Sequence, residues 1–157
     1  MALEYSQETL QSLEELKAKY PDNRSAIMNA LHITQKEFGY ISNEAVDALA
    51  NVLELPPQYI EDTAEFYTMF FKQPVGRHVI WICHTLSCAI RGAADVLLHI
   101  EKTLGVKVGE TTEDGKFSLF KAECLASCGT APMMQIDDKY YEDLTLEKVD
   151  KILGSFD

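Results

Sequence analysis

The fold is decided by residues 78–88, which read His-Val-Ile-Trp-Ile-Cys-His-Thr-Leu-Ser-Cys. The first five residues have the β-branched and aromatic character of a buried strand, and that strand delivers Cys83 at its end. Four residues separate Cys83 from Cys88, and a second pair, Cys124 and Cys128, follows another strand-like stretch with three residues between its members. The chain has no other cysteines. Because loops at the ends of two strands can meet in space, a site of four thiolates built across both loops is sterically reasonable.

Three kinds of site use four cysteines, and the spacing separates them only in part. Structural zinc sites pair cysteines two to four residues apart, and some iron–sulfur ferredoxins use a gap of four residues. Two disulfides would suit a small secreted domain. However, Met1-Ala2-Leu3-Glu4 has neither the basic start nor the apolar core of a secretory signal, so we expect a protein that stays inside the cell. Neither pair has the Cys-x-x-Cys spacing of a thiol–disulfide oxidoreductase.

Residues 1–73 are predicted to form a small helical bundle. Apolar residues recur at helical spacing in four segments, and polar or proline residues stand at their expected starts, namely Ser6, Asn23, Ser42 and Pro56-Pro57. The dense aromatic stretch 66–71 is expected to be a buried connection, with a subunit interface as the alternative. His32 has no metal-binding motif around it, so we expect an ordinary surface or core histidine.

Residues 74–157 are predicted to form a second unit, because Pro74 and Gly76 interrupt the pattern. After the strand that ends at Cys83, a helix is expected over 92–104 and a last helix between Thr145 and Gly154. Further strands are expected at 106–108, 117–121, 133–136 and 139–141, with turns at 114–115 and 137–138. The pattern by itself indicates an α/β domain.

Composition narrows the range of partners. The 14 basic and 25 acidic side chains leave a net charge of −11, which disfavours nucleic acid and anionic lipid surfaces and favours a partner with a basic face. The apolar runs are far shorter than the ~20 residues that span a bilayer, so we expect no direct membrane insertion. There is no P-loop and no Gly-x-Gly-x-x-Gly, so nothing in the sequence suggests that this chain itself binds NADH or flavin.

Several motifs spread over most of the chain belong together. They are Phe38-Gly39-Tyr40-Ile41, residues 65–70, residues 74–77, the first cysteine pair with Arg91-Gly92-Ala93, residues 109–117 and residues 123–132. In these motifs the chain closely resembles the E-type peripheral [2Fe–2S] subunit of NADH:quinone oxidoreductase (respiratory complex I). One departure is visible, because Ala126 stands where that family usually has glycine; if the position needs a positive φ, alanine is strained there.

The resemblance implies an α+β fold, with an N-terminal helical bundle (1–73) followed by a thioredoxin-like α/β ferredoxin domain (74–157). It implies one [2Fe–2S] cluster on Cys83, Cys88, Cys124 and Cys128, and no catalytic residue or complete active site in this chain alone. FMN and NADH are expected on an adjacent subunit that contacts both the bundle and the cluster domain. The chain would then transfer single electrons on the peripheral arm of the translocase, at the cytoplasmic side of a bacterial inner membrane.

Two alternatives remain beside this interpretation. The same module serves NAD-linked hydrogenases and formate dehydrogenases, and a zinc-stabilised structural adaptor would use the same four cysteines without redox chemistry. His84 invites a comparison with Rieske centres, but those use two histidines, so we expect His84 to be exposed or only adjacent to the site. Small residues beside the ligands should let main-chain N–H groups approach the sulfurs; they are Ser87, Ala89, Ser127 and Gly129.

Overall fold

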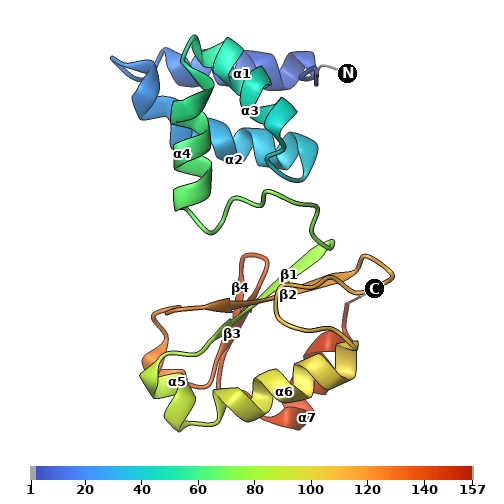
Figure 1. Ribbon diagram of the computed structural model, residues 1–157. Coiled ribbons are helices and arrows are strands. Elements are labelled where there is room, and N and C mark those ends of the chain that lie inside the picture. Colours follow the sequence, from blue (N-terminus) through green and yellow to red (C-terminus); the bar gives the residue numbers. More distant parts are fainter. Residues whose placement is uncertain (1–2, 157) are drawn as a thin grey trace. The chain divides into compact units, whose positions relative to one another are not determined.

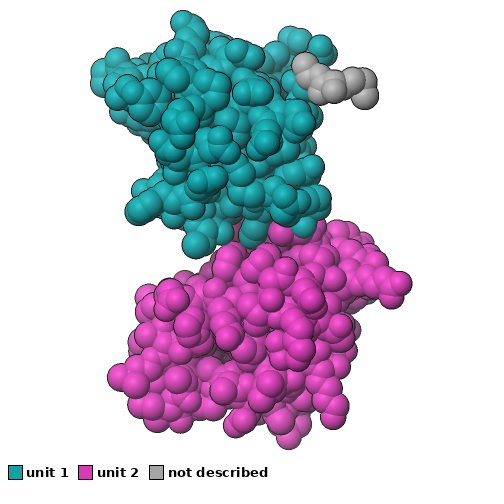
Figure 2. All heavy atoms as spheres, in the orientation of Figure 1, with its two compact units in different colours: residues 1–74 teal, residues 75–157 magenta. Residues whose placement is uncertain are grey.

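The computed structural model describes residues 3–156. The chain divides into two compact units, residues 1–74 and residues 75–157, which are coloured separately in Figure 2. The boundary expected from the sequence lay between residues 73 and 74, one position earlier. No helix within residues 3–156 is both long enough and apolar enough to cross a bilayer.

The first unit is helical (Figure 1). Its elements are α1 (Gln7–Lys17), the short 3₁₀ helix η1 (Asn23–Ala26), α2 (Ile27–Phe38), α3 (Asn43–Leu53) and α4 (Pro57–Phe66). One apolar stripe from each α-helix meets the others in a common core, so that Leu13, Leu31, Leu49, Leu53 and Ile60 are fully buried. This confirms the predicted N-terminal helices.

The helix starts were predicted correctly with one exception. Ser6 and Ser42 accept the N–H groups of Thr9 and Ala45, as N-cap residues do. The prediction that Asn23 caps a helix is wrong, because the carboxylate of Asp22 accepts the N–H of the second residue after it at 2.9 Å. Asn23 instead donates its side-chain amide to the carbonyl of Leu53, 30 residues away, at 2.8 Å. The sequence around a cap does not reveal such a distant acceptor.

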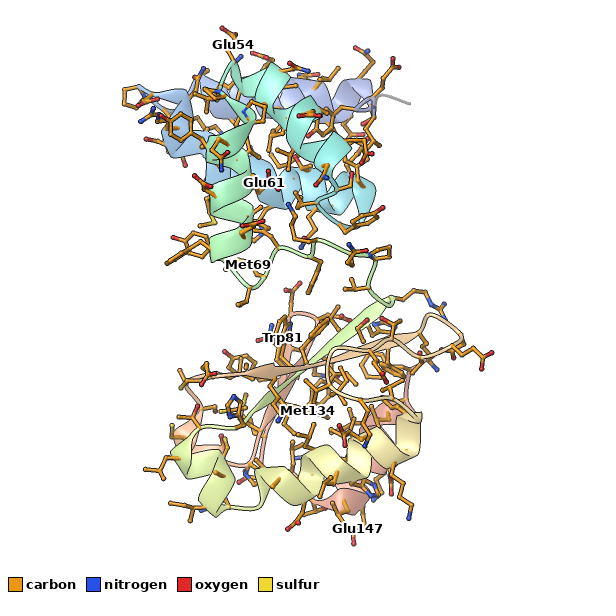
Figure 3. All side chains as sticks on the ribbon, in the orientation of Figure 1. Glu54, Glu61, Met69, Trp81, Met134 and Glu147 are labelled. Carbon is orange, nitrogen blue, oxygen red and sulfur yellow. The ribbon has the colours of Figure 1, made fainter. Side chains whose placement is uncertain are left out.

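The aromatic stretch after α4 is only partly buried. Phe70 is 4% exposed and packs in the core of the first unit, as expected for a buried connection. Gln35 fixes this segment by donating to the carbonyl of Met69 and accepting from the N–H of Phe71. Phe66, Tyr67 and Met69 are exposed instead, at 77%, 36% and 43%, so the expectation of burial is wrong for these three. Met69 is labelled in Figure 3.

The second unit contains a mixed four-stranded sheet of order β2-β1-β3-β4 (Figure 1). Its strands are β1 (His78–Cys83), β2 (Phe117–Ala122), β3 (Met134–Ile136) and β4 (Lys139–Tyr141). β1 and β2 are parallel, and the crossover helix α6 (Ala93–Leu104) connects them. β3 pairs antiparallel with β1 and forms a hairpin with β4. Sequence and structure therefore agree on an α+β chain with helices first and a sheet domain second.

Alternation along β1 separates the two faces of the sheet. Ile80 and Ile82 point toward α6 and α7 (Leu146–Leu153), which cover one face and complete a core that includes Ile100 and Val149. Trp81 lies on the opposite face and stacks on the ring of Phe120 at 4.9 Å between centroids (Figure 3). This period-two pattern is typical of a strand whose two faces have different neighbours.

The sequence prediction was wrong for one strand and missed two short helices. Residues 106–108 are not a strand, because the chain turns at Gly109 (φ +90°) and pairs with β2 only afterwards, through the N–H of Gly109 and the carbonyl of Glu110. Helix α5 (Leu86–Ile90) and the 3₁₀ turn η2 (Cys128–Thr130) were not predicted. α5 follows Cys83 and η2 follows Cys124. Both are too short for apolar residues to recur at helical spacing.

Candidate metal centre

Parallel pairing of β1 and β2 brings both cysteine loops to one end of the sheet. Cys83 is the last residue of β1 and lies opposite Ala122, the last residue of β2. Cys88 lies in α5, directly after β1, and Cys124 is only two residues beyond β2. Cys128 begins η2. All four thiols are free of disulfide bonds.

The first pair is buried and interacts directly. Cys83 and Cys88 are 4% and 2% exposed, and their side chains are hydrogen-bonded to each other. Burial acts to raise the pKa of Cys83, but the N–H groups of Thr85 and Leu125 and the thiol of Cys88 outweigh it, so this pKa lies below its ordinary value. Burial, reinforced by the hydrogen bond to Cys83, raises the pKa of Cys88 to about 11. The hydrogen bond between the two thiols acts on their pKa values in opposite directions, downward for Cys83 and upward for Cys88.

The N–H groups that face the sulfurs come from both loops. Leu125 belongs to the second cysteine loop, so its hydrogen bond to Cys83 joins the two loops across the end of the sheet. The N–H of Met133 faces Cys88, which also senses the charges of Cys83 and Cys128. The N–H of Ala126 donates to the sulfur of Cys124 at 3.4 Å.

The N–H donors described above belong to Thr85, Leu125, Ala126 and Met133, and not to the four small residues that stand beside the ligands in the sequence. Close approach of main chain to sulfur was expected near Ser87, Ala89, Ser127 and Gly129. The N–H of Ala89 is instead used within α5, where it donates to the carbonyl of Thr85 at 2.9 Å. Sequence reasoning missed the donors at Thr85, Leu125 and Met133, since a main-chain N–H carries no residue-specific signal.

The second pair lies in a more open loop. Cys124 and Cys128 are exposed, in contrast to the first pair. Between them, Ala126 has φ +59°, in the left-handed region where glycine is usually found. The strain that the sequence raised as a possibility is therefore present in the backbone.

His84 does not take part in the thiol cluster. Its Nε2 faces the Glu123 carboxylate at 3.4 Å, and both side chains are largely exposed. The side chain lies next to the site, as the sequence suggested, and its imidazole is directed at a carboxylate.

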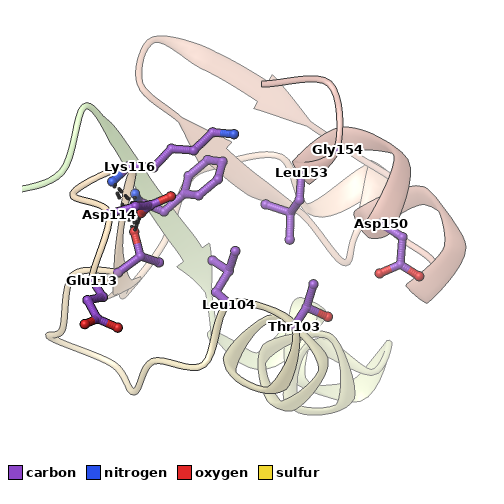
Figure 4. Close-up of a pocket in the computed structure, with 10 residues that line it drawn as sticks. Thr103, Leu104, Glu113, Asp114, Lys116, Asp150, Leu153 and Gly154 are labelled. Carbon is purple, nitrogen blue, oxygen red and sulfur yellow. Dashed lines mark hydrogen bonds between the residues drawn. The ribbon is translucent and has the colours of Figure 1, made fainter. Parts of the chain in front are cut away.

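Two hollows in the second unit differ in their relation to the cysteines. The larger, a shallow groove of about 750 Å³, lies between the end of α6, residues 112–117 and the end of α7, and no cysteine lines it (Figure 4). Since Phe117 begins β2, the groove is at the opposite end of that strand from Cys124. A smaller cavity of about 110 Å³ lies beside Cys83, between the ends of β1 and β2 and the start of α6. Cys83 is the one cysteine that lines this smaller cavity.

Four cysteine thiols are a donor set that both structural zinc sites and [2Fe–2S] clusters use. Within residues 3–156, no three side chains of the His, Cys, Asp or Glu type gather closely enough to hold a single ion. A structural zinc site needs four ligands around one ion, whereas a [2Fe–2S] cluster distributes four thiolates over two irons. The two cysteine pairs lie in neighbouring loops, with main-chain N–H donors facing Cys83 and Cys88.

Comparisons with known proteins agree with this chemistry. The model of the family described as "Thioredoxin-like [2Fe-2S] ferredoxin" matches residues 13–157. The chain is 41% identical to the E-type subunit 2 of the NADH-quinone oxidoreductase of Rhizobium meliloti, over 93% of this chain and 87% of that protein. It is 43% identical to the E-type subunit of the NADH-quinone oxidoreductase of Rickettsia conorii, over 95% and 91% of the two chains.

A solved structure shows the same fold in a larger protein. The chain superimposes with a TM-score of 0.72 on the structure titled "Crystal structure of NAD+-reducing [NiFe]-hydrogenase in the air-oxidized state". The two sequences are 23% identical, and the match covers 82% of this chain but only 22% of the hydrogenase chain, so it concerns the fold alone.

Proposed function

The chain belongs to the thioredoxin-like [2Fe–2S] ferredoxin family, and on that premise we propose that it is the E-type electron-transfer subunit of an NADH:quinone oxidoreductase. One [2Fe–2S] cluster would be held by Cys83, Cys88, Cys124 and Cys128. The observation that carries this proposal is the meeting of two loops with four free cysteines at one end of the sheet. The cluster, when bound, supplies a carrier that accepts and releases one electron at a time.

The residues of this chain supply the environment that such a carrier needs. Four thiolates give the cluster a net negative charge that increases on reduction, and the main-chain N–H groups of Thr85, Leu125, Ala126 and Met133 are the dipoles that offset it. Burial of Cys83 and Cys88 limits contact with water on one side of the site. The exposed second pair leaves the other side open toward a partner.

We propose that the partner is the subunit that carries FMN and NADH. Leu86 and Ile90, 71% and 76% exposed, lie on α5 on either side of Cys88 in the sequence. In the first unit, Phe66 and Met69 are also exposed. Apolar side chains so far out of the core are typical of protein interfaces. Both units would thus contribute a contact to the flavin-bearing partner, on the peripheral arm at the cytoplasmic side of the membrane.

The runner-up function is the equivalent subunit of an NAD-linked hydrogenase or formate dehydrogenase. The fold likeness to the NAD+-reducing hydrogenase is the observation in its favour, although identity to the E-type quinone reductase proteins is higher. Purification of the tagged chain from its native host distinguishes the two, since quinone reductase subunits would accompany it in one case and hydrogenase or formate dehydrogenase subunits in the other.

Low-temperature EPR, with iron and zinc measured on the same sample, tests the cluster itself. We expect a silent oxidised state, an S = 1/2 signal after reduction with dithionite and about two irons per chain. Replacement Cys124→Ser should alter or abolish the signal, whereas Ser155→Ala, far from the cysteines in the sequence, should leave it unchanged. Stoichiometric zinc without iron would establish the structural adaptor instead.

A further inference from the structure

The loop that carries Cys128 is held by a carboxylate that follows β4. The hydroxyl of Thr130 donates to Glu142 at 2.6 Å, and the hydroxyl of Ser127 donates to the same oxygen in a short hydrogen bond. The two hydroxyls are themselves 2.8 Å apart. Glu142 thus binds the residue immediately before Cys128 and the residue two positions after it. The pKa of Glu142 is lowered by these two hydroxyls, in keeping with an ionised acceptor.

The same loop is also held by a cation from the first cysteine loop. Nε of Arg91, the residue after α5, donates to the carbonyl of Ala131 at 2.7 Å. This contact joins the end of the helix that contains Cys88 to the segment that follows Cys128. Both contacts span large sequence distances, 40 residues for Arg91 and at least 12 for Glu142.

We propose that Arg91 and Glu142 are positioning residues of the [2Fe–2S] site, which fix the Cys128 loop at different residues and bias the reduction potential in opposite directions. The inference rests on the proposed function, because it concerns the cluster held by the same four cysteines. Neither side chain is a ligand. Each acts through the loop that it binds and through its charge.

The sign of each effect follows from the charge balance. Reduction adds one electron to the cluster and no positive charge, so the reduced state is more negative by one unit. A nearby cation stabilises the reduced state and raises the potential, whereas a nearby anion lowers it. The ammonium of Lys148 donates to the main-chain carbonyl of Glu142 and places a positive charge close to the carboxylate. It is unchanged in the variants below.

An EPR-monitored redox titration of the full chain with its cluster tests the proposal. Glu142→Gln keeps an acceptor for the hydroxyls of Ser127 and Thr130 but removes the negative charge. Arg91→Gln removes the positive charge. Both substitutions affect residues that lie within three positions of Cys128 in the sequence. We expect each to change the reduction equilibrium about threefold, about 28 mV for one electron, upward for Glu142→Gln and downward for Arg91→Gln. Both shifts should shrink at 1 M salt, because exposed charges are screened. Glu113→Gln, an equal charge change at the far groove, should leave the potential unchanged.

Two further variants separate position from charge. Arg91→Lys keeps the cation but loses the guanidinium donor, and Ser127→Ala with Thr130→Val keeps Glu142 charged but leaves it without its loop donors. Both should speed amide hydrogen exchange in residues 126–131, also in protein without iron, while Arg91→Lys stays near the wild-type potential. If Arg91→Gln fails to bind a cluster, the hydrogen exchange of these two variants still tests the positioning role.

Two results would overturn the inference. One is a reduction potential that moves in the same direction in Glu142→Gln and Arg91→Gln, or that moves in neither variant, while the wild-type protein holds its cluster. The other is unchanged hydrogen exchange in the loop of all four variants. A wild-type protein that contains no [2Fe–2S] cluster is a different outcome, since it contradicts the proposed function and leaves the exchange experiment to decide the positioning role.

Discussion

Replacement of Ala126 by glycine should stabilise the cluster domain, although glycine usually weakens a folded chain. Ala126 has φ +59°, and a side chain in this region costs about 1–2 kcal/mol relative to the right-handed conformation. Glycine removes that strain but adds about 0.5–1 kcal/mol of backbone entropy cost on folding. The difference is a gain of about 0.5–1 kcal/mol in the free energy of unfolding, or about 4 °C in Tm for a unit of this size.

Urea unfolding followed by tryptophan fluorescence measures this gain in the correct unit. The chain has a single tryptophan, Trp81 in β1, so its fluorescence reports the second unit. The matched control is Ala94→Gly, on an exposed position in the first turn of α6, where glycine should destabilise by less than the roughly 1 kcal/mol that it costs in a helix interior. The two substitutions are chemically identical and should have opposite signs. Ala126→Gly as destabilising as Ala94→Gly would refute the left-handed conformation and the argument built on it.

Three further predictions concern other parts of the chain. Gly76→Ala should destabilise the second unit by about 1–3 kcal/mol in urea unfolding, because an added Cβ would lie 2.8 Å from the carbonyl carbon of Phe117. Burial raises the pKa of Tyr5 to about 12, above its value near 10 in the unfolded chain. The stability that the neutral Tyr5 side chain contributes is therefore complete below pH 10 and is lost as the pH rises toward 12. Thermal melts followed by circular dichroism should show that Tyr5→Phe loses less stability over this pH range than the wild type does. Ile90→Ser should weaken copurification with the flavin-bearing subunit while changing the free energy of unfolding of the isolated chain, measured in urea, by less than about 0.5 kcal/mol. Leu98→Ser, also exposed but on α6, should leave copurification intact.

The elements that could be predicted from sequence are those whose signal is local. Ser6 and Ser42 precede apolar residues at helical spacing, and the stretch before Cys83 is β-branched and aromatic, so caps and periodicity were sufficient there. The prediction of a strand at residues 106–108 failed because two valines around a lysine resemble a strand in sequence. The segment that pairs with β2 begins only at Gly109. Helix α5 was missed because it has five residues and its apolar side chains, Leu86 and Ile90, face outward.

The cysteines of the candidate site were visible because four thiols in two close pairs are rare, but their surroundings were not. Leu125 contributes an N–H, which every residue except proline has, and it reaches Cys83 only through the tertiary fold. Arg91 was noted as part of a motif, but its acceptor lies 40 residues away. Glu142 is one of 25 acidic residues, and nothing in its local sequence distinguishes it. Long-range partners of ordinary residue types therefore set the limit of the sequence analysis.

The parallel pairing of β1 and β2 explains why a helix lies between the two cysteine loops in the sequence. β1 and β2 each have six residues, so an antiparallel pair would separate the ends that carry Cys83 and Cys124 by about 17–20 Å. No cluster of two irons could join thiols at that distance. Parallel pairing brings both ends together, but it requires a crossover connection, which α6 supplies. The buried side chains of α6, such as Val96 and Ile100, consequently support the site as much as the loops do, because without their packing the two loops would not share one end of the sheet.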